Sequence, residues 1–286
     1  MATMENTRAA SQLWARVRLL RESPVGMIGA FLVIFWIVVA ILAPIVAPYD
    51  PNANNMDALS DPTPSAVNWL GADMQGRDIL SRIIWGSRTV LTVAPIAVFI
   101  AYIIGSLLGL LAGYYRGWVD TLINRISDII LSFPAIVLYI IVIMRFGPSA
   151  FNIVLAVIFI ATPQIARIVR GMTLELRERE YVAAAKMRGE SALYIMITEI
   201  LPNARGPLIV DACLRMGYTT IAIGVLGFLG LGLPPPDPDW GGMVKESYAL
   251  MSIYPHMALL PAAAITSLVV GFSLLADGMR EISMRD

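Results

Sequence analysis

The amino-acid sequence predicts an all-α, polytopic membrane protein with six transmembrane helices. Two observations lead to this fold class. First, 57% of the 286 residues are hydrophobic and 15% are charged, whereas soluble domains have about 45–50% apolar and about 25% charged residues. Second, six stretches lack Asp, Glu, Lys and Arg and approach or exceed the length that crosses a hydrocarbon core of about 30 Å. These stretches are 23–49, 89–115, 129–144, 146–166, 216–236 and 247–276.

Each stretch is assigned from its length and its borders. The first follows an arginine-bearing segment, but it is too long for a signal peptide and has no small-residue cleavage site before Pro44, so it predicts a retained helix. The third is short, and we expect its helix to extend through Asp128 to Ser127 or Ile126. The fifth ends in three consecutive prolines, and the apolar part of the sixth is 255–276.

The distribution of Lys and Arg predicts the orientation, because cytoplasmic loops carry an excess of basic residues. Six spans place both termini on one side. That side carries 15 basic residues and the other side carries five, so both termini are predicted to be cytoplasmic. The 15 are Arg8, Arg16, Arg18, Arg21, Arg116, Arg125, Arg167, Arg170, Arg177, Arg179, Lys186, Arg188, Arg205, Arg280 and Arg285; the five are Arg77, Arg82, Arg88, Arg145 and Lys245.

The composition excludes several classes of function. The 21 basic and 21 acidic residues cancel, which disfavours a nucleic-acid binder. A single Cys and a single His exclude a disulfide framework and a Cys/His zinc site. No phosphate-binding loop occurs. We therefore expect no catalytic residue, no metal and no nucleotide in this chain, and we expect packing roles for Cys213 and His256.

The positions of charged residues near the predicted spans indicate which source of energy would drive transport. An ion-driven carrier usually places ionisable groups inside the bilayer, because they bind the coupled ion. Here the predicted spans carry charges only at their ends: Asp128, Arg145, Asp211, Arg215 and Asp277. This pattern favours transport that is powered from outside the chain. A stand-alone secondary transporter and a structural membrane subunit remain the alternatives.

The longest polar segment on the basic side predicts a helical hairpin at 174–203. Strong helix formers precede Gly189, which is the usual type of residue just past a helix end. Ser191 is expected to cap a second helix over 192–200, and Pro202 is expected to end it. Such a hairpin, with apolar side chains among charged ones, suits docking into a groove of a partner. An amphipathic helix that lies on lipid headgroups fits the same composition.

The hairpin resembles the EAA loop of ATP-binding-cassette importer permeases. The matching residues are Ala183-Ala184-Ala185, then Gly189, then Leu201-Pro202, with Ala183 where the family pattern has Glu. Glu180-Tyr181-Val182 is similar to the lead-in of the peptide-importer branch.

Three further stretches resemble the same branch. Residues 70–82 read Leu-Gly-Ala-Asp-Met-Gln-Gly-Arg-Asp-Ile-Leu-Ser-Arg and are similar to its outer-loop motif, which includes Asp73, Gly76, Arg77 and Asp78. Residues 113–134 resemble its next run, which ends in Phe133-Pro134. Residues 226–232 with 239–241 resemble its L-x-F-L-G-L-G and W-G elements. The resemblance covers the chain from about residue 23 to residue 281.

This resemblance implies the type I importer fold and a division of the chain. Residues 1–87 would hold the N-terminal cytoplasmic segment, the first transmembrane helix and the first periplasmic loop. Residues 88–286 would form the core of five helices with the coupling loop 174–203. The residues implied in coupling to an ATPase are Glu180, Ala183, Ala184, Ala185, Arg188, Gly189, Leu201 and Pro202.

The resemblance also implies a function and its partners. The chain would be the second permease subunit of a dipeptide or oligopeptide importer in the bacterial inner membrane. Nickel chelates or glutathione are alternative substrates. Its partners would be a homologous permease, two cytoplasmic ATPases that bind ATP and Mg²⁺, and an extracytoplasmic substrate-binding protein.

Two glycine series and two outer loops leave alternatives open. Gly105, Gly109 and Gly113 recur every four residues, and Gly224, Gly227 and Gly230 recur every three. Both series favour close helix packing, and both also fit a moving interface that gates a pathway. The polar residues at 73–78 fit a solvated turn or an ion pair. Trp240, followed by two glycines, fits either contact with a binding protein or an ordinary interfacial Trp.

Overall fold

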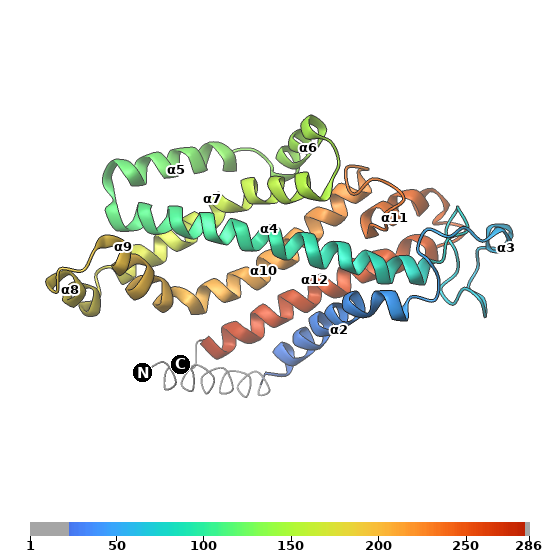
Figure 1. The fold of residues 1–286 in the computed structure, drawn as a ribbon, viewed down its shortest axis with the longest axis horizontal. Coiled ribbons are helices and arrows are strands. Elements are labelled where there is room, and N and C mark those ends of the chain that lie inside the picture. The colour runs from blue at the N-terminus through green and yellow to red at the C-terminus, as the bar shows by residue number, and fades with distance from the viewer. Residues whose placement is uncertain (1–22, 284–286) are drawn as a thin grey trace.

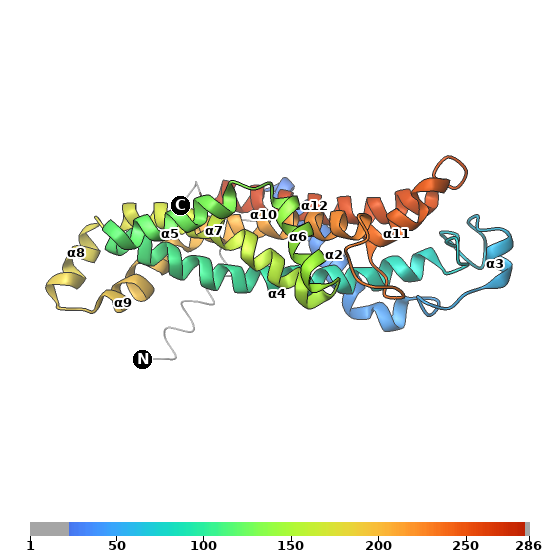
Figure 2. The ribbon, with the colours of Figure 1, turned by 90° about the horizontal axis from the view of Figure 1, so that it is seen from above.

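The computed structural model describes residues 23–283, and these residues form an elongated bundle of helices (Figures 1 and 2). Within this range the only β pairing is an isolated bridge between Ala72 and Asp78. The elements are α2 (Pro24–Val46), α3 (Met56–Ser60), α4 (Ile79–Tyr115), α5 (Gly117–Leu131), α6 (Ala135–Phe146), α7 (Ala150–Leu176), α8 (Glu180–Met187), α9 (Ala192–Tyr194), a π-helix (Ile195–Ile200), α10 (Leu201–Phe228), α11 (Trp240–Ser247), a 3₁₀ turn (Tyr248–Leu250) and α12 (His256–Ser283).

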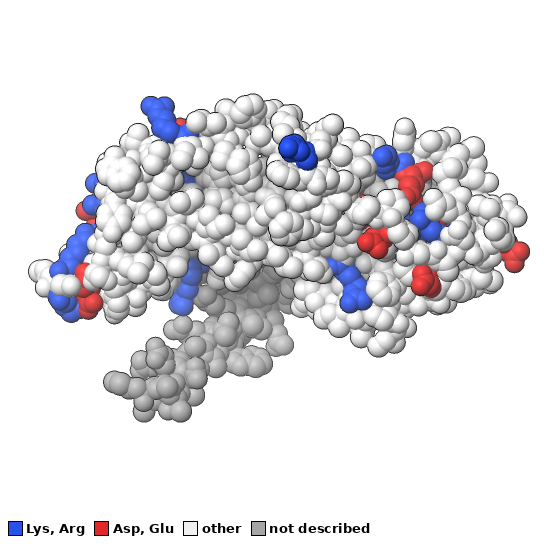
Figure 3. All heavy atoms as spheres, turned by 45° about the horizontal axis from the view of Figure 1, so that its top comes forward, with Lys and Arg blue, Asp and Glu red and all other residues white. Residues whose placement is uncertain are grey.

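Five helices of the described range are long and apolar enough to cross a membrane. These are α2, α4, α7, α12 and the helical run 192–228, and the bent pair of α5 and α6 would make a sixth span. The prediction of an all-α polytopic protein is therefore confirmed. The surface agrees with it: large side chains of α2 such as Phe31 and Ile45 are 68% and 81% exposed, as expected for lipid-facing positions. On the face in Figure 3, charged side chains gather toward the two ends and the middle is mostly uncharged.

The third predicted helix, which was expected to extend through Asp128 to Ser127 or Ile126, is interrupted. The chain breaks at 132–134, and α5 and α6 meet there at 84°. Pro134 explains the break, because a proline disfavours helical backbone at the preceding residue and has no N–H to donate. α5 runs beside α4 and α7, whereas α6 lies across them (Figure 1).

Two helices also begin well before the predicted spans. α4 begins at Ile79 and contains Arg82 and Arg88, which were assigned to a loop. α10 begins at Leu201 and contains Asp211 and Arg215, which were placed at the end of a span. Charges did not end these helices because the buried ones are paired: Arg82 lies 3.5 Å from Asp73 and Arg215 lies 2.7 Å from Asp211.

Side-chain caps explain where several helices begin. Ser23 accepts a hydrogen bond from the N–H of Gly26 before α2, and Asp78 accepts one from Ser81 before α4. Ser149 does the same for Asn152 before α7. Each cap satisfies a backbone donor that the first helical turn leaves free. The helices then pack pairwise, α4 on α7 and α2 on α12, with Trp36 Nε1 donating to Ser267 Oγ at 2.9 Å.

The two ends of the bundle differ in structure. α8 and α9 form one end, which we call the hairpin end, and α3 and α11 lie at the other, the loop end (Figure 1). α2 starts toward the hairpin end and α12 finishes toward it. The basic residues of 1–22, which contributed to the predicted orientation, lie outside the described residues, as does Arg285.

Candidate functional site

The hairpin is anchored to the bundle through one apolar face. Val182, Ala185 and Ile195 are at most 1% exposed, and they belong to a cluster that includes Val169 of α7 and Leu110 of α4. Arg177 extends the anchor, since its Nη1 donates to the carbonyl oxygens of residues 113 and 114 at the end of α4. The hairpin is therefore an integral part of the fold.

The opposite face of the hairpin is exposed and partly apolar. Met187 is 84% exposed and Leu193 is 58% exposed. Buried residues cannot contact a partner, and this sorts the predicted coupling residues. Glu180, Ala183, Arg188, Gly189 and Pro202 are exposed, Ala184 and Leu201 are half-buried, and Ala185 is fully buried. The burial of Ala185 gives it a packing role inside the anchor.

The turn of the hairpin follows the predicted pattern. Gly189 has a φ of 80°, in the left-handed region where a side chain is costly. Ser191 accepts a hydrogen bond from the N–H of Tyr194 at 3.2 Å and so caps the next helix. Arg188 pairs with Glu199 across the turn at 3.3 Å. These contacts fix the angle at which the exposed face is presented.

The expectation that Pro202 ends the second helix is wrong. The backbone continues without a break from α9 through the π-helix of 195–200 into α10, and Pro202 lies in the first turn of α10. A proline ring clashes with the carbonyl four residues earlier in α geometry. The wider π turn in front of Pro202 is consistent with relief of that clash, and π turns of this kind are frequent at functional sites.

The outer-loop motif at the loop end is a compact, buried turn. Asp73, Arg77 and Asp78 are 5%, 3% and 4% exposed, so the solvated turn is excluded and the ion pair is correct. Arg77 donates to Asp73 and to Glu246 of α11, each at 2.6 Å. Gly76 turns the chain at a φ of 73°. The motif thereby ties the first loop and α4 to α11, which precedes α12.

Trp240 is fully buried, so neither interpretation of it as an exposed residue holds. Its Nε1 donates to the carbonyl of Ile83 at 2.9 Å, and its ring meets that of Trp36 at a centroid distance of 4.9 Å. The preceding residue, Asp239, caps α11 through the N–H of Gly241. Burial raises the pKa of the Asp239 carboxyl to about 6.

The two glycine series have different neighbours. Gly105, Gly109 and Gly113 all face α7, where an added Cβ would lie 2.6–2.7 Å from its nearest atoms. The series at 224–230 does not form one helix seam. Gly224 faces Ile265 of α12, Gly227 faces the Asp239 carboxylate, and Gly230 lies beyond the end of α10 near Lys245. Gly230 therefore belongs to a turn, because α10 ends at Phe228.

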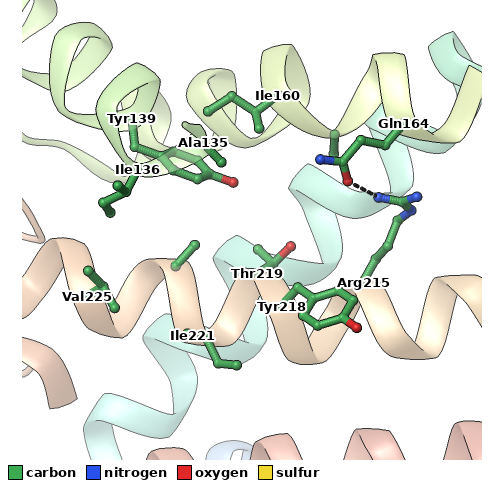
Figure 4. A pocket seen from close by; sticks show the side chains of 12 residues that line it. Ala135, Ile136, Tyr139, Ile160, Gln164, Arg215, Tyr218, Thr219, Ile221 and Val225 are labelled. Carbon is green, nitrogen blue, oxygen red and sulfur yellow. Dashed lines mark hydrogen bonds between the residues drawn. The ribbon is translucent and has the colours of Figure 1, made fainter. Parts of the chain in front are cut away.

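A polar cluster inside the bundle was missed by the sequence reasoning. Asp211 and Arg215 lie one turn apart on α10, and the Tyr102 hydroxyl of α4 donates to Asp211. Arg215 Nη1 donates to Gln164 Oε1 of α7 at 2.8 Å (Figure 4). The cluster thus bridges three helices, and Arg215 lies near the midpoint of α10. The available signal was the Asp–Arg spacing of four residues, which lets the two charges neutralise each other on one helix face.

The cluster borders a cavity of about 470 Å³ between α6, α7 and α10. Its lining is mostly apolar and comprises Ala135, Ile136, Tyr139, Ile160, Ala161, Gln164, Arg215, Tyr218, Thr219, Ile221, Ala222 and Val225. Rim residues such as Tyr218 and Ile221 are 66% and 43% exposed. Other cavities in the described part, of about 230, 260 and 450 Å³, do not combine this size with a buried charge.

A multi-span bundle with a buried polar cluster, an open cavity between helices and an anchored, exposed hairpin fits the class of membrane transport permeases. Residues 105–285 match the family described as the binding-protein-dependent transport system inner membrane component, and residues 12–63 match the N-terminal TM domain of oligopeptide transport permease C. The chain belongs to this permease family, and it is the membrane-spanning component of an ATP-binding-cassette importer.

Named relatives are similar over nearly the whole chain. The glutathione transport system permease protein GsiD of Pectobacterium atrosepticum is 41% identical over 265 residues, which cover 92% of this chain and 87% of that protein. The protein of the same name from Escherichia coli O6:K15:H31 is 43% identical over 271 residues, which cover 94% of this chain and 88% of the relative. A permease of this family is a multi-pass inner-membrane protein that works with a partner permease, ATPases and a binding protein.

The buried charges correct one argument about energy. Asp211 and Arg215 lie inside α10, so the absence of intramembrane charges does not distinguish this chain from an ion-driven carrier. Family membership makes that distinction instead, since the chain belongs to the permeases of ATP-binding-cassette importers.

Proposed function

We propose that this permease imports short peptides with the energy of ATP that its partner subunits hydrolyse. Dipeptides, oligopeptides and glutathione, itself a tripeptide, form the proposed substrate class. The names of the similar permeases support glutathione, and the match to an oligopeptide permease segment supports longer peptides. Uptake of a labelled dipeptide, glutathione and a nickel chelate by the reconstituted importer would separate these substrates. Preference for the nickel chelate would contradict the proposal.

The proposed partners are a homologous permease, two ATPases and an extracytoplasmic binding protein. ATP and Mg²⁺ would bind to the ATPases, and this chain would contribute no catalytic group. Purification of the tagged native chain followed by mass spectrometry would identify the partners. Robust ATP hydrolysis by the purified chain alone, surviving repurification, would contradict the proposed division of labour.

The proposed coupling site is the exposed face of the hairpin. The observation that carries this proposal is the contrast between its two faces: Val182 is fully buried in the anchor, whereas Met187 is 84% exposed on the other side. An anchored helix with exposed apolar side chains can transmit a push from a docked ATPase to α7 and α10, which flank it. The hairpin would then be cytoplasmic, together with both termini, in the inner membrane.

The test replaces two hairpin residues. Gly189→Val places a β-branched side chain at a φ of 80°, which strains the turn by about 1–2 kcal/mol or more. Ala184→Glu adds bulk and charge to the docking face. Both variants should reach the membrane and keep the partner permease, yet lose ATPase subunits and uptake. Co-purification stoichiometry measures this loss.

Matched controls make the same chemical changes elsewhere. Gly147→Val introduces comparable strain at a φ of 90° with open space around it, at the turn between α6 and α7. Ala53→Glu adds a charge at an exposed position of the loop end. Both controls should retain full ATPase occupancy. If Gly189→Val and Ala184→Glu also retain it, the hairpin is a surface helix and the coupling proposal is wrong.

A further inference from the structure

The cavity between α6, α7 and α10 has a polar wall of one chemical character. Its polar side chains are Arg215, Gln164, Tyr139, Tyr218 and Thr219, and every one of them can donate a hydrogen bond. The only charged group in the lining is the Arg215 guanidinium. Asp211, which balances its charge, does not line the cavity. The cavity therefore presents a cation and several donors, and no carboxylate.

The hydrogen bonds around Arg215 leave donors for a ligand. A guanidinium has five N–H donors, and the bonds to Asp211 and Gln164 use two of them. The oxygen of the Gln164 amide accepts from Arg215, and the NH₂ group of that side chain offers two donors. Figure 4 shows the Tyr139 hydroxyl pointing into the space between α7 and α10, on the side of Thr219. These groups converge on the cavity from three helices.

The position of Arg215 makes the arrangement selective. The guanidinium lies near the midpoint of α10 with a side chain that is 9% exposed, and buried ionisable groups within membrane-spanning helices mark substrate pathways. An anionic oxygen would gain charge-assisted hydrogen bonds there, which are stronger than bonds between neutral groups. Asp211 competes for the same guanidinium.

We propose that Arg215 recognises the carboxylate of a solute as it passes through the cavity, with Gln164 as its positioning residue. The proposal rests on the proposed import of peptides and names the group on them that the permease itself reads. A free C-terminal carboxylate is the ligand chemistry. A peptide whose terminus is an amide lacks the negative charge but keeps the same size and shape.

The experiment uses the complete importer in proteoliposomes, with its partner permease, ATPases and binding protein. The probes are a dipeptide with uncharged side chains, as the free acid and as the C-terminal amide, and glutathione as the free acid only, because its γ-glutamyl residue keeps a carboxylate when the terminus is amidated. The affinity of each probe for the isolated binding protein is measured first, and uptake is compared at equal loading of that protein. The readout is the ratio of acid uptake to amide uptake.

Two variants prevent Arg215 from binding a solute carboxylate in different ways. Arg215→Gln removes the charge, and Gln164→Glu places a carboxylate beside Arg215 that occupies its free donors while preserving the bridge from α7 to α10. In both, uptake of the acid should fall at least about tenfold, while uptake of the amide changes little. Arg167→Gln, which removes an exposed arginine of α7 paired with Asp128, is the matched control and should leave the ratio unchanged.

The outcomes separate the two proposals. A wild-type ratio near one, or equal losses of acid and amide uptake in Gln164→Glu, would overturn the role of Arg215 while peptide import stands. If Arg215→Gln fails to assemble, the acid-to-amide ratio of Gln164→Glu decides alone, because the ion pair between position 164 and Arg215 keeps α7 and α10 linked in that variant. Uptake of none of the probes by the wild-type importer would overturn the proposed substrate class and this inference with it.

Discussion

Replacement of Gly109 by Ala tests whether α4 and α7 depend on direct backbone contact. A Cβ at position 109 would lie 2.6 Å from Val169 Cβ and 2.6 Å from the Ala166 carbonyl oxygen. Neither atom can swing aside, since one is backbone and the other is attached directly to it. The two helices must therefore move apart at this point.

The size of the effect follows from these distances. Carbon atoms pack best at about 3.5–4.0 Å, so relief of a 2.6 Å contact requires a separation of about 1 Å, and a gap of that size forfeits a quarter to a half of the dispersion energy of the atoms along it. Overpacking of this kind in a well-packed interior costs about 1–3 kcal/mol. We expect Gly109→Ala to lower the free energy of unfolding by that amount.

A second glycine provides the control. Gly171 lies on α7, and an added Cβ there would meet nothing within 4 Å. Gly171→Ala should therefore be neutral or raise stability by up to about 1 kcal/mol through helix propensity. Thermal unfolding of the detergent-solubilised variants compares the two. Equal melting temperatures for Gly109→Ala and Gly171→Ala would refute the packing argument.

Three further outcomes are expected. In a cysteine-free background, cysteines at Asn54 and Met187 should react with impermeant reagent from opposite sides of the membrane, and same-side labelling would contradict the proposed topology. Arg77→Ala should cost about 1.5–3 kcal/mol of stability, because it removes the 2.6 Å charged hydrogen bond to the buried Asp73 carboxylate, which keeps Arg82 at 3.5 Å, whereas exposed Asn52→Ala should be nearly silent; equal losses of stability in the two variants would remove that distinction. Asp239 has a higher pKa in the folded protein, about 6, than in the unfolded chain, about 4. Its contribution to the free energy of unfolding is therefore fully present below about pH 4 and is lost as the pH rises toward about 6. Asp239→Asn should flatten that part of the pH profile of the melting temperature, and an unchanged profile would assign the pH dependence to another group.

The hairpin shows how far local sequence reasoning reached into the candidate site. The left-handed turn at Gly189 and the cap at Ser191 were both predictable, because each depends on residues within a few positions of itself. The burial of Ala185 was not, since it depends on α4 and α7 lying against the hairpin. Likewise, Pro202 is tolerated only because a π turn precedes it, and a propensity scale holds no information about that turn.

Charged residues show even more clearly the difference between what the local sequence predicts and what tertiary contacts decide. A rule that ends a span at the first charge assumes that the charge faces lipid or water. Arg82 and Arg215 instead lie inside helices, because carboxylates from the first loop and from the same helix neutralise them. The cost of a buried charge is set by its partner, and partners from other elements are not visible along the chain.

The sequence by itself determined the class of this protein: helical, polytopic, and built around an ordered set of permease motifs. Apolar length and basic asymmetry are one-dimensional quantities, and the bilayer acts on them directly. Only the tertiary structure decided the burial of Trp240 and the cavity beside Arg215. Those features depend on which helices touch, since close packing and the pairing of buried polar groups act between segments that lie far apart in the chain.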